Sequence, residues 1–203
     1  MTTLNPTRVM VRSREMAEVA ELVRAAAEGD RDAWDALVDR FNGLVWSVAR
    51  SHRLSTVDAS DVVQTTWLRL VEHLGRLQEP ERVGAWLATT ARRESLRTLR
   101  QSARQVPTEE LPEVAEDAKL DAALLVKERD RALWQAFGEL NERCRGLLRL
   151  LVADPAPSYE EISAALDMPI GSIGPTRQRC LERLRRLAEG EGVTSTDRRD
   201  SDE

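Results

Sequence analysis

The fold of the C-terminal part is decided by residues 158–187, which read SYEEISAALDMPIGSIGPTRQRCLERLRRL. Ser158 and Glu161 have the spacing of a capping box, which opens a short helix. This helix should turn inward Ile162, Ala165 and Leu166. Residues 167–171 form a tight turn before a second helix that is dense in arginine. Two short helices joined in this way are typical of a helix-turn-helix, whose last helix enters the DNA major groove.

The arginine-rich helix should begin at a Ser172 cap and hold Pro175 in its first turn, where a missing amide hydrogen costs nothing. Helical spacing turns inward Ile173, Cys180, Leu181, Leu184 and Leu187. It turns outward Pro175, Gln178, Arg179, Glu182, Arg183 and Arg186. The net charge of residues 172–187 is +4.

The outward side chains suit duplex DNA. Gln178 and Arg179 lie in the N-terminal half, where glutamine can pair with adenine and arginine with guanine. Arg183, Arg185 and Arg186 are better placed for phosphates. An ordinary helix pair with a solvated basic face would give the same pattern, so both interpretations stay open.

Upstream of this motif, apolar residues recur at helical spacing and no stretch alternates like a strand, which predicts an all-α fold. An amphipathic segment lies near residues 16–27, and Asp30 is the expected N-cap of a helix over about residues 32–53. A helix over about 58–74 should end at Gly75 and bury Val63, Trp67, Leu70, Val71 and Leu74. From residue 124 on, the inward residues should be Leu133, Phe137, Leu140, Cys144, Leu147, Leu148 and Leu151.

Another helix, from Val83 to about Arg104, combines an apolar stripe with a basic ridge. Its inward residues should be Val83, Trp86, Leu87, Thr90 and Ala91. The ridge consists of Arg93, Arg97, Arg100 and Arg104, and residues 90–104 carry a net charge of +4. Such a ridge neutralises phosphates and releases counterions. Trp86 is either a core residue or a stacking platform for an unpaired base.

The helix over residues 58–74 offers a different surface. Opposite its apolar stripe, Asp61, Gln64, Leu68 and Glu72 line up at steps of three, four and four. An exposed leucine within a stripe of acids and an amide is a plausible protein-docking face. A merely solvated helix face is the alternative.

Several classes of protein are disfavoured by the sequence. No apolar run approaches the roughly 20 residues that a membrane span needs, and the first 18 residues contain no apolar core of a signal peptide, so a cytoplasmic location is expected. Cys144 and Cys180 form neither a disulfide framework nor a zinc pattern, and we expect buried, reduced thiols. His52 and His73 have no fixed acid partner, and the sequence predicts no cofactor, no metal site and no enzyme.

The net charge of −5 is an average over segments of opposite sign. Residues 105–121 hold Pro107, Pro112 and a net charge of −5, which predicts a solvated linker. The tail from residue 188 carries −4, so +4 remains on the helical parts. We therefore expect nucleic acid at the helical parts and not at the acidic segments.

The order of these parts resembles a known family. The stretches DVVQTTWLRL at residues 61–70 and AWLATTARR at residues 85–93 resemble region 2 of bacterial RNA polymerase sigma factors. The stretch YEEISAAL at residues 159–166, followed by Gly171-Ser172-Ile173, is similar to their region 4. Two regions and one acidic linker resemble the extracytoplasmic-function (ECF) group of the sigma-70 family. Asp167 stands where this family usually has a turn glycine, and aspartate can adopt the same left-handed conformation.

The resemblance implies two helical domains and their limits. Residues 17–104 would form region 2, 105–123 the flexible acidic linker, 124–188 region 4, and 189–203 a disordered acidic tail. The implied partners are promoter DNA and core RNA polymerase, through its beta-prime clamp helices and beta flap, with an anti-sigma protein as a further partner. No membrane insertion is implied.

The resemblance also implies roles for residues. The beta-prime clamp helices would contact Asp61, Gln64, Leu68 and Glu72. The −10 element would be melted and read by Trp86, Thr89, Thr90, Arg92, Arg93, Arg97 and Arg100. The −35 element would be read as duplex by Ser172, Pro175, Thr176, Arg177, Gln178, Arg179, Arg183 and Arg186.

Two other functions fit parts of the sequence. A regulator that uses only the C-terminal helix-turn-helix would bind DNA without being a polymerase subunit, but the receiver domain typical of response regulators predicts alternating strands and helices upstream. A helical adaptor that binds protein alone would show no salt-sensitive DNA binding and no transcription with core polymerase.

Overall fold

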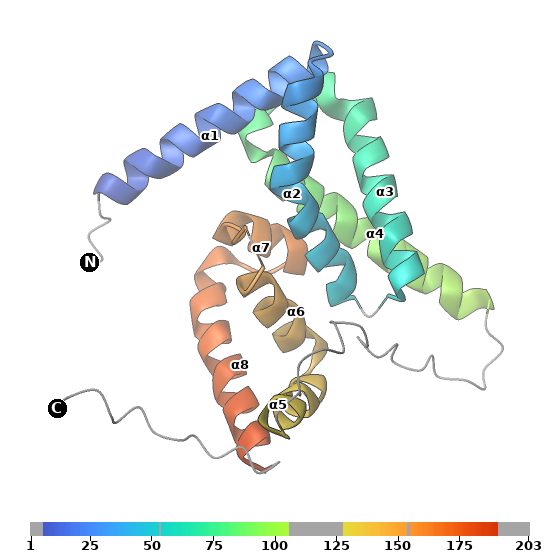
Figure 1. Ribbon diagram of the computed structural model, residues 1–203, viewed down its shortest axis with the longest axis vertical. Coiled ribbons are helices and arrows are strands. Elements are labelled where there is room, and N and C mark those ends of the chain that lie inside the picture. The colour runs from blue at the N-terminus through green and yellow to red at the C-terminus, as the bar shows by residue number, and fades with distance from the viewer. Residues whose placement is uncertain (1–5, 53, 106–127, 154, 191–203) are drawn as a thin grey trace.

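The computed structural model describes residues 6–52, 54–105, 128–153 and 155–190, and within these ranges it contains helices and no strand (Figure 1). The first group of helices is α1 (Pro6–Ala27), α2 (Arg31–Ser51), α3 (Thr56–His73), the 3₁₀ turns η1 (Leu74–Arg76) and η2 (Pro80–Arg82), and α4 (Val83–Gln105). The second group is α5 (Glu128–Gly138), α6 (Glu142–Leu151), α7 (Tyr159–Leu166) and α8 (Ile170–Gly190). The all-α prediction is confirmed. Almost all of the predicted linker and tail lies outside the described residues.

Side-chain caps fix where several helices begin. Asp30 is the N-cap of α2, as predicted, and its Oδ1 accepts hydrogen bonds from the backbone N–H of Asp32 at 2.9 Å and of Ala33 at 3.1 Å. The predicted capping box of α7 is also confirmed. The Ser158 hydroxyl oxygen accepts from the Glu161 N–H at 3.2 Å, and Glu161 Oε2 accepts from the Ser158 N–H at 2.6 Å.

The turn between α7 and α8 has the predicted conformation at its start but not at its end. Asp167 ends α7 in the left-handed region with φ of 51°, as expected. However, α8 begins at Ile170 rather than after a Ser172 cap, because the Ser172 hydroxyl donates back to the Pro169 carbonyl at 2.7 Å. Pro175 therefore lies inside the helix, where its missing N–H leaves the Gly171 carbonyl without its usual helical partner.

A second end was also predicted incorrectly. Gly75 does not cap α3, because the chain continues from Leu74 into the 3₁₀ turn η1. Among the described glycines, only Gly29, in the turn before α2, has a positive φ, at 96°. Glycine is needed there because a side chain rarely adopts this conformation.

Most of the predicted inward residues are buried or half-buried, and three are exposed. In α3 the buried residues are Ala59, Val62, Thr66 and Leu70, while Val63 and Trp67 are half-buried and Val71 is 57% exposed. In the second group, Leu133 and Leu181 are each 43% exposed, although both were predicted to face inward. Val71 and Leu181 each directly follow a buried residue, Leu70 and Cys180, and a helix advances by 100° per residue, so an error of one position moves a side chain to the edge of the apolar stripe.

The two groups of helices pack directly against each other. In Figure 1, α7 lies across α4 and α6 lies beside the end of α2, and both pairs are in contact. The hydrophobic core runs through both groups, from Leu37, Phe41 and Leu87 to Leu147 and Ile162. Gly84 in α4 makes this closeness possible, because a Cβ atom there would overlap the Glu161 carboxylate and lie 2.8 Å from the Phe41 ring.

The cysteine prediction was wrong. Cys144 of α6 and Cys180 of α8 are joined by a disulfide, with their Cα atoms 5.3 Å apart. Both side chains are buried, as expected, but the sequence spacing gave no sign of the pairing because the two helices meet only in the fold.

Candidate nucleic-acid interface

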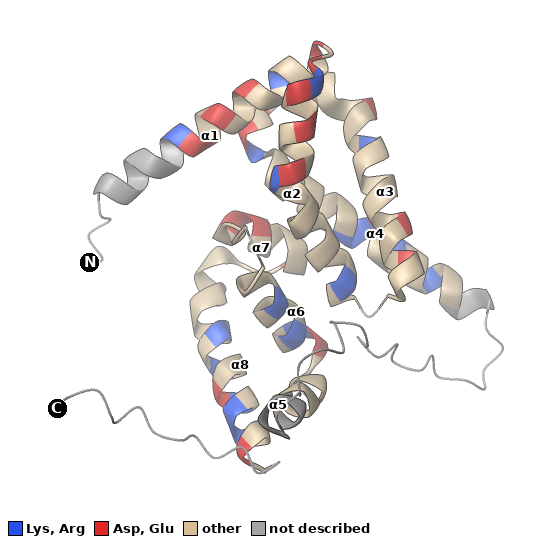
Figure 2. Ribbon diagram, viewed as in Figure 1, with Lys and Arg blue, Asp and Glu red and all other residues tan. Residues whose placement is uncertain are grey.

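The outer face of α8 is open to solvent. Pro175, Arg177, Gln178, Arg179, Arg183 and Arg186 are exposed, whereas Ser172 and Thr176 are half-buried. The Arg179 guanidinium makes only long contacts within its own helix, at 3.4 Å from the Pro175 carbonyl and 3.4 Å from the Thr176 hydroxyl. Its side chain can therefore turn toward another molecule at little cost. Figure 2 shows the basic residues recurring along α8.

The basic ridge of α4 is also accessible. Arg93, Arg97 and Arg100 are exposed, and the Arg104 side chain lies outside the described residues. Glu94 is the acid in this stretch, and it pairs with Arg69 of α3 at 2.9 Å and with Arg97 at 3.7 Å. Part of the ridge is thus oriented by an acid that also ties α4 to α3.

Near the start of α4, the other predicted −10 residues are only partly accessible. Trp86, Thr89 and Thr90 are half-buried, and Trp86 packs against the core with its ring centroid 5.9 Å from that of His73. The Thr89 hydroxyl donates to the Ala85 carbonyl at 2.9 Å. In this arrangement Trp86 serves as a core residue that keeps part of its ring at the surface.

Arg92 connects the two groups of helices. Its Nη2 lies 2.8 Å from Oδ2 of Asp167, the residue that ends α7. His52, Arg92 and Asp167 line a cleft between the two groups of helices. Burial of the His52 imidazole, reinforced by the positive charge of Arg92, lowers its pKa. Among the predicted −10 residues in the described part of the chain, Arg92 is therefore the one that pairs with an acid of the second group of helices.

The predicted docking face on α3 is exposed along its whole length. Asp61, Gln64 and Glu72 are exposed, and Leu68 is 58% exposed. Two valines extend this face and were missed. Val57 lies one helical turn before Asp61, and Val71 lies beside Glu72. The spacing from Asp61 could have revealed Val57, whereas Val71 had been assigned to the core.

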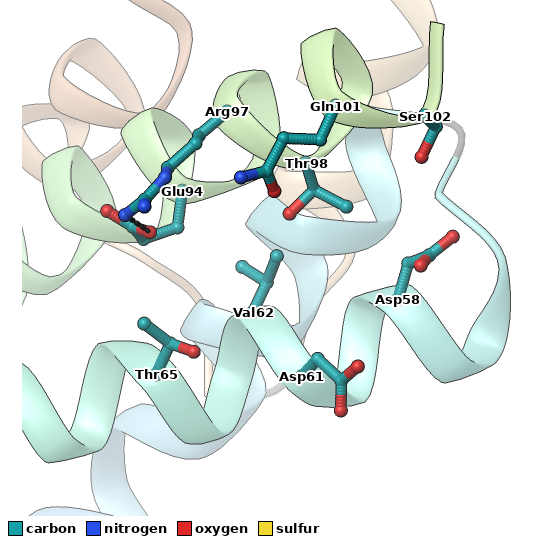
Figure 3. A pocket seen from close by; sticks show the side chains of 9 residues that line it. All are labelled: Asp58, Asp61, Val62, Thr65, Glu94, Arg97, Thr98, Gln101 and Ser102. Carbon is teal, nitrogen blue, oxygen red and sulfur yellow. Dashed lines mark ion pairs between the residues drawn. The ribbon is translucent and has the colours of Figure 1, made fainter. Parts of the chain in front are cut away.

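A polar cleft of about 350 Å³ lies between parts of α3 and α4 and connects the docking face of α3 with the basic ridge of α4. Figure 3 shows Thr98 and Gln101 reaching from α4 toward α3, with Glu94 and Arg97 paired beside them. Asp61 of the docking face and Arg97 of the ridge both line this cleft. A molecule bound to one surface would therefore lie close to a molecule bound to the other.

Other kinds of site find no support in the described ranges. These residues contain no cluster of three or more His, Cys, Asp or Glu side chains that could hold a metal ion. None of the helices there combines the length and apolar character of a membrane span.

The chain is similar to known proteins over both groups of helices. Residues 37–105 match the family model of Sigma-70 region 2. The ECF RNA polymerase sigma-E factor of Haemophilus influenzae is 24% identical over 165 residues, covering 75% of this chain and 85% of that protein. The factor of the same name from Escherichia coli strain K12 is 26% identical over 163 residues, covering 75% of this chain and 84% of that protein.

Two solved structures share the fold. One is CnrH in complex with the cytosolic domain of CnrY, with a TM-score of 0.56, 21% identity, and coverage of 85% of this chain and 97% of that one. The other is the sigma factor RpoE of Bartonella quintana in complex with the anti-sigma factor NepR, with a TM-score of 0.55, 23% identity, and coverage of 79% and 98%.

Residues 37–105 thus carry a Sigma-70 region 2, and the all-helical fold, the basic helix faces and these similarities support a promoter-specificity subunit of RNA polymerase that is not an enzyme itself. Over most of its length the chain is similar to ECF sigma factors of the sigma-70 family.

Proposed function

We propose that three surfaces of the chain divide the work of promoter recognition. The α3 face of Asp61, Gln64, Leu68 and Glu72 docks on the beta-prime clamp helices of core polymerase. The α4 face from Trp86 to Arg100 reads the −10 element, and the α8 face from Ser172 to Arg186 reads the −35 element. The observation that carries this proposal is that α4 and α8 each expose arginines, while the α3 face combines acids, an amide and apolar side chains.

The mechanism needs binding but no bond chemistry. Exposed arginines of α4 neutralise phosphates and release counterions, which favours association with DNA. The half-buried Trp86 lies about two to four turns before these arginines, where its ring can stack on an unpaired base. Strand opening is then driven by capture of the unpaired base and the displaced strand.

The proposal extends to domains, partners and location. Residues 17–104 act as the region that binds core polymerase and the −10 element, and residues 124–188 act as the region that binds the −35 element and the beta flap. The segment 105–123 threads toward the active centre and the RNA exit path. Because one structure of similar fold holds an anti-sigma factor, we include such a protein among the partners. The cytoplasm is the compartment in which these partners meet the chain.

Promoter binding also requires the two groups of helices to separate. Elements at −10 and −35 lie about 25 base pairs apart, or about 85 Å along straight duplex. A compact chain of this length has a radius of gyration of about 17 Å. In the structure α7 contacts both α4 and α8, so the two DNA-binding helices are held in one body. Opening must break the contact of Arg92 with Asp167 and the close packing at Gly84.

Photo-crosslinking tests this division of surfaces. A photoreactive amino acid is placed at Gln64, Arg93 or Gln178, all exposed positions, and the holoenzyme is irradiated on a promoter fragment that it transcribes. We expect crosslinks to the beta-prime subunit from position 64, to DNA near −10 from position 93, and to DNA near −35 from position 178. Position 39, an exposed aspartate on α2, is the control and should give no crosslink to the beta-prime subunit or to DNA.

The positions of the two DNA crosslinks decide the outcome. Sites separated by about two helical turns of duplex or more agree with opened groups of helices. Crosslinks from positions 93 and 178 to the same few base pairs would contradict the proposal, as would crosslinking of position 64 to DNA alone.

A further inference from the structure

The Cys144–Cys180 disulfide is not used by any of the three proposed surfaces. It joins α6 to α8 across 36 residues of sequence. Cys144 is 9% exposed and Cys180 is 1% exposed, so the bond lies inside the second group of helices. Cytosolic disulfides in most organisms are transient and serve catalysis or redox sensing. A buried pair in a chain that we place in the cytoplasm therefore calls for a role.

The bond holds the middle of α8. Of the 21 residues of this helix, the buried ones are Ile173 near its start, Cys180 and Ala188 near its end. Gln178, Arg179 and Arg183 lie within three positions of Cys180 and are exposed. The disulfide thus anchors α8 at the level of the side chains proposed to contact DNA.

The other end of the bond is fixed in the structure. The backbone N–H of Cys144 donates to Asn141 Oδ1 at 2.8 Å, which caps α6. Further along α6, Arg149 Nη1 donates to the Arg50 carbonyl at 2.8 Å, and Gly146 packs against Ser51 and Leu166. The contacts of α6 with α7 lie within the second group of helices and can persist when the two groups separate, so the disulfide ties α8 to a helix that stays in place within that group.

We propose that Cys144 and Cys180 form a reversible oxidation site that controls the affinity of α8 for promoter DNA. This inference rests on the proposed role of α8. A low-molecular-weight disulfide supplies the oxidising equivalents. One cysteine thiolate attacks it and releases one thiol, and the second cysteine then attacks the mixed disulfide and releases the other. Two electrons and two protons leave the cysteine pair, and a dithiol reverses the change while it becomes a disulfide itself.

The oxidised form should be the more stable one. A bond that closes 36 residues of sequence restricts the unfolded chain, which raises the melting temperature by roughly 10 °C or more for a group of helices of this size. In the reduced form α8 loses its covalent anchor, and a smaller fraction of molecules holds it in the binding geometry. Apparent affinity falls with that fraction, so we expect −35 DNA binding to weaken roughly 3- to 10-fold.

The experiment uses the full chain after treatment with dithiothreitol or with oxidised glutathione. Thiols are counted by mass spectrometry after maleimide labelling in denaturant, melting is followed by circular dichroism, and binding to a −35 duplex is measured at fixed salt. The variant Cys144→Ala with Cys180→Ala is the control, and it should behave alike under both treatments. In the native sequence, the number of labelled thiols should fall from two after dithiothreitol to none after oxidised glutathione. The oxidised chain should also melt at a higher temperature and bind the duplex more tightly.

Three other results are informative. Two free thiols after prolonged oxidant treatment would overturn the inference, and so would a disulfide that changes neither melting nor DNA affinity. If melting responds to the treatment but neither form binds the duplex, the oxidation site is supported and the proposed role of α8 is contradicted instead.

Discussion

Replacing Asp61 and Gln64 together by alanine should weaken binding to core RNA polymerase by about 100-fold. Both side chains are exposed on α3, one turn apart, and Leu68 follows on the same face. Loss of two polar contacts at the centre of an interface can cost about 2.7 kcal/mol, which corresponds to this change in affinity. Neither side chain contributes to the core of the fold, so the helix content and the melting temperature should stay unchanged.

The control is a pair of exposed carboxylates on another helix. The variant Asp35→Ala with Asp39→Ala removes two exposed charges that lie one helical turn apart on α2. Its affinity for core polymerase should stay within about twofold of that of the native chain. Affinity is measured by titrating labelled chain with core polymerase. If the α3 variant binds as tightly as the α2 variant, the α3 face is not the docking surface.

Arg179→Ala should lower affinity for a matched −35 duplex by about 10- to 100-fold and relax the base preference at one position. This is the effect of losing one bidentate contact to a base, about 1–3 kcal/mol. Arg179 is exposed in the half of α8 that we propose enters the groove, and only long contacts within α8 hold its guanidinium. Core binding should not change, because α3 lies in the other group of helices.

Arg186→Ala is the matched comparison for Arg179→Ala. Arg186 is exposed two turns further along α8, where we expect a phosphate contact. Its loss should weaken matched and mismatched duplexes alike and reduce the salt slope by about one. A series of duplexes with single base changes, measured at several salt concentrations, separates the two cases. If both variants lose affinity without any change in base preference, α8 does not read bases through Arg179.

The parts of the fold that depend on local sequence could be predicted. Asp30, Ser158 and Asp167 act within three residues of themselves, by capping a helix or by ending one in a left-handed conformation. The exposed rows on α3, α4 and α8 follow from helical spacing alone. These features were therefore visible before any contact between distant segments was known.

The remaining features depend on contacts between distant segments. The pairing of Cys144 with Cys180, the contact of Arg92 with Asp167, and the fit of Glu161 over Gly84 all join helices whose relative placement the sequence pattern leaves open. Val71 and Leu133 were misplaced for a related reason. An apolar residue at the border of a stripe faces inward only if a neighbouring helix covers it, and none covers these two enough.

Transcription by purified core polymerase with and without this chain tests the central claim most directly. With genomic fragments as templates, the chain should produce transcripts absent from core alone. Their start sites should lie at a fixed distance downstream of a shared motif with two parts. If the chain binds DNA fragments but core polymerase makes no new promoter-specific transcript in its presence, the account is contradicted, and a helix-turn-helix regulator that acts outside the polymerase would be the better description.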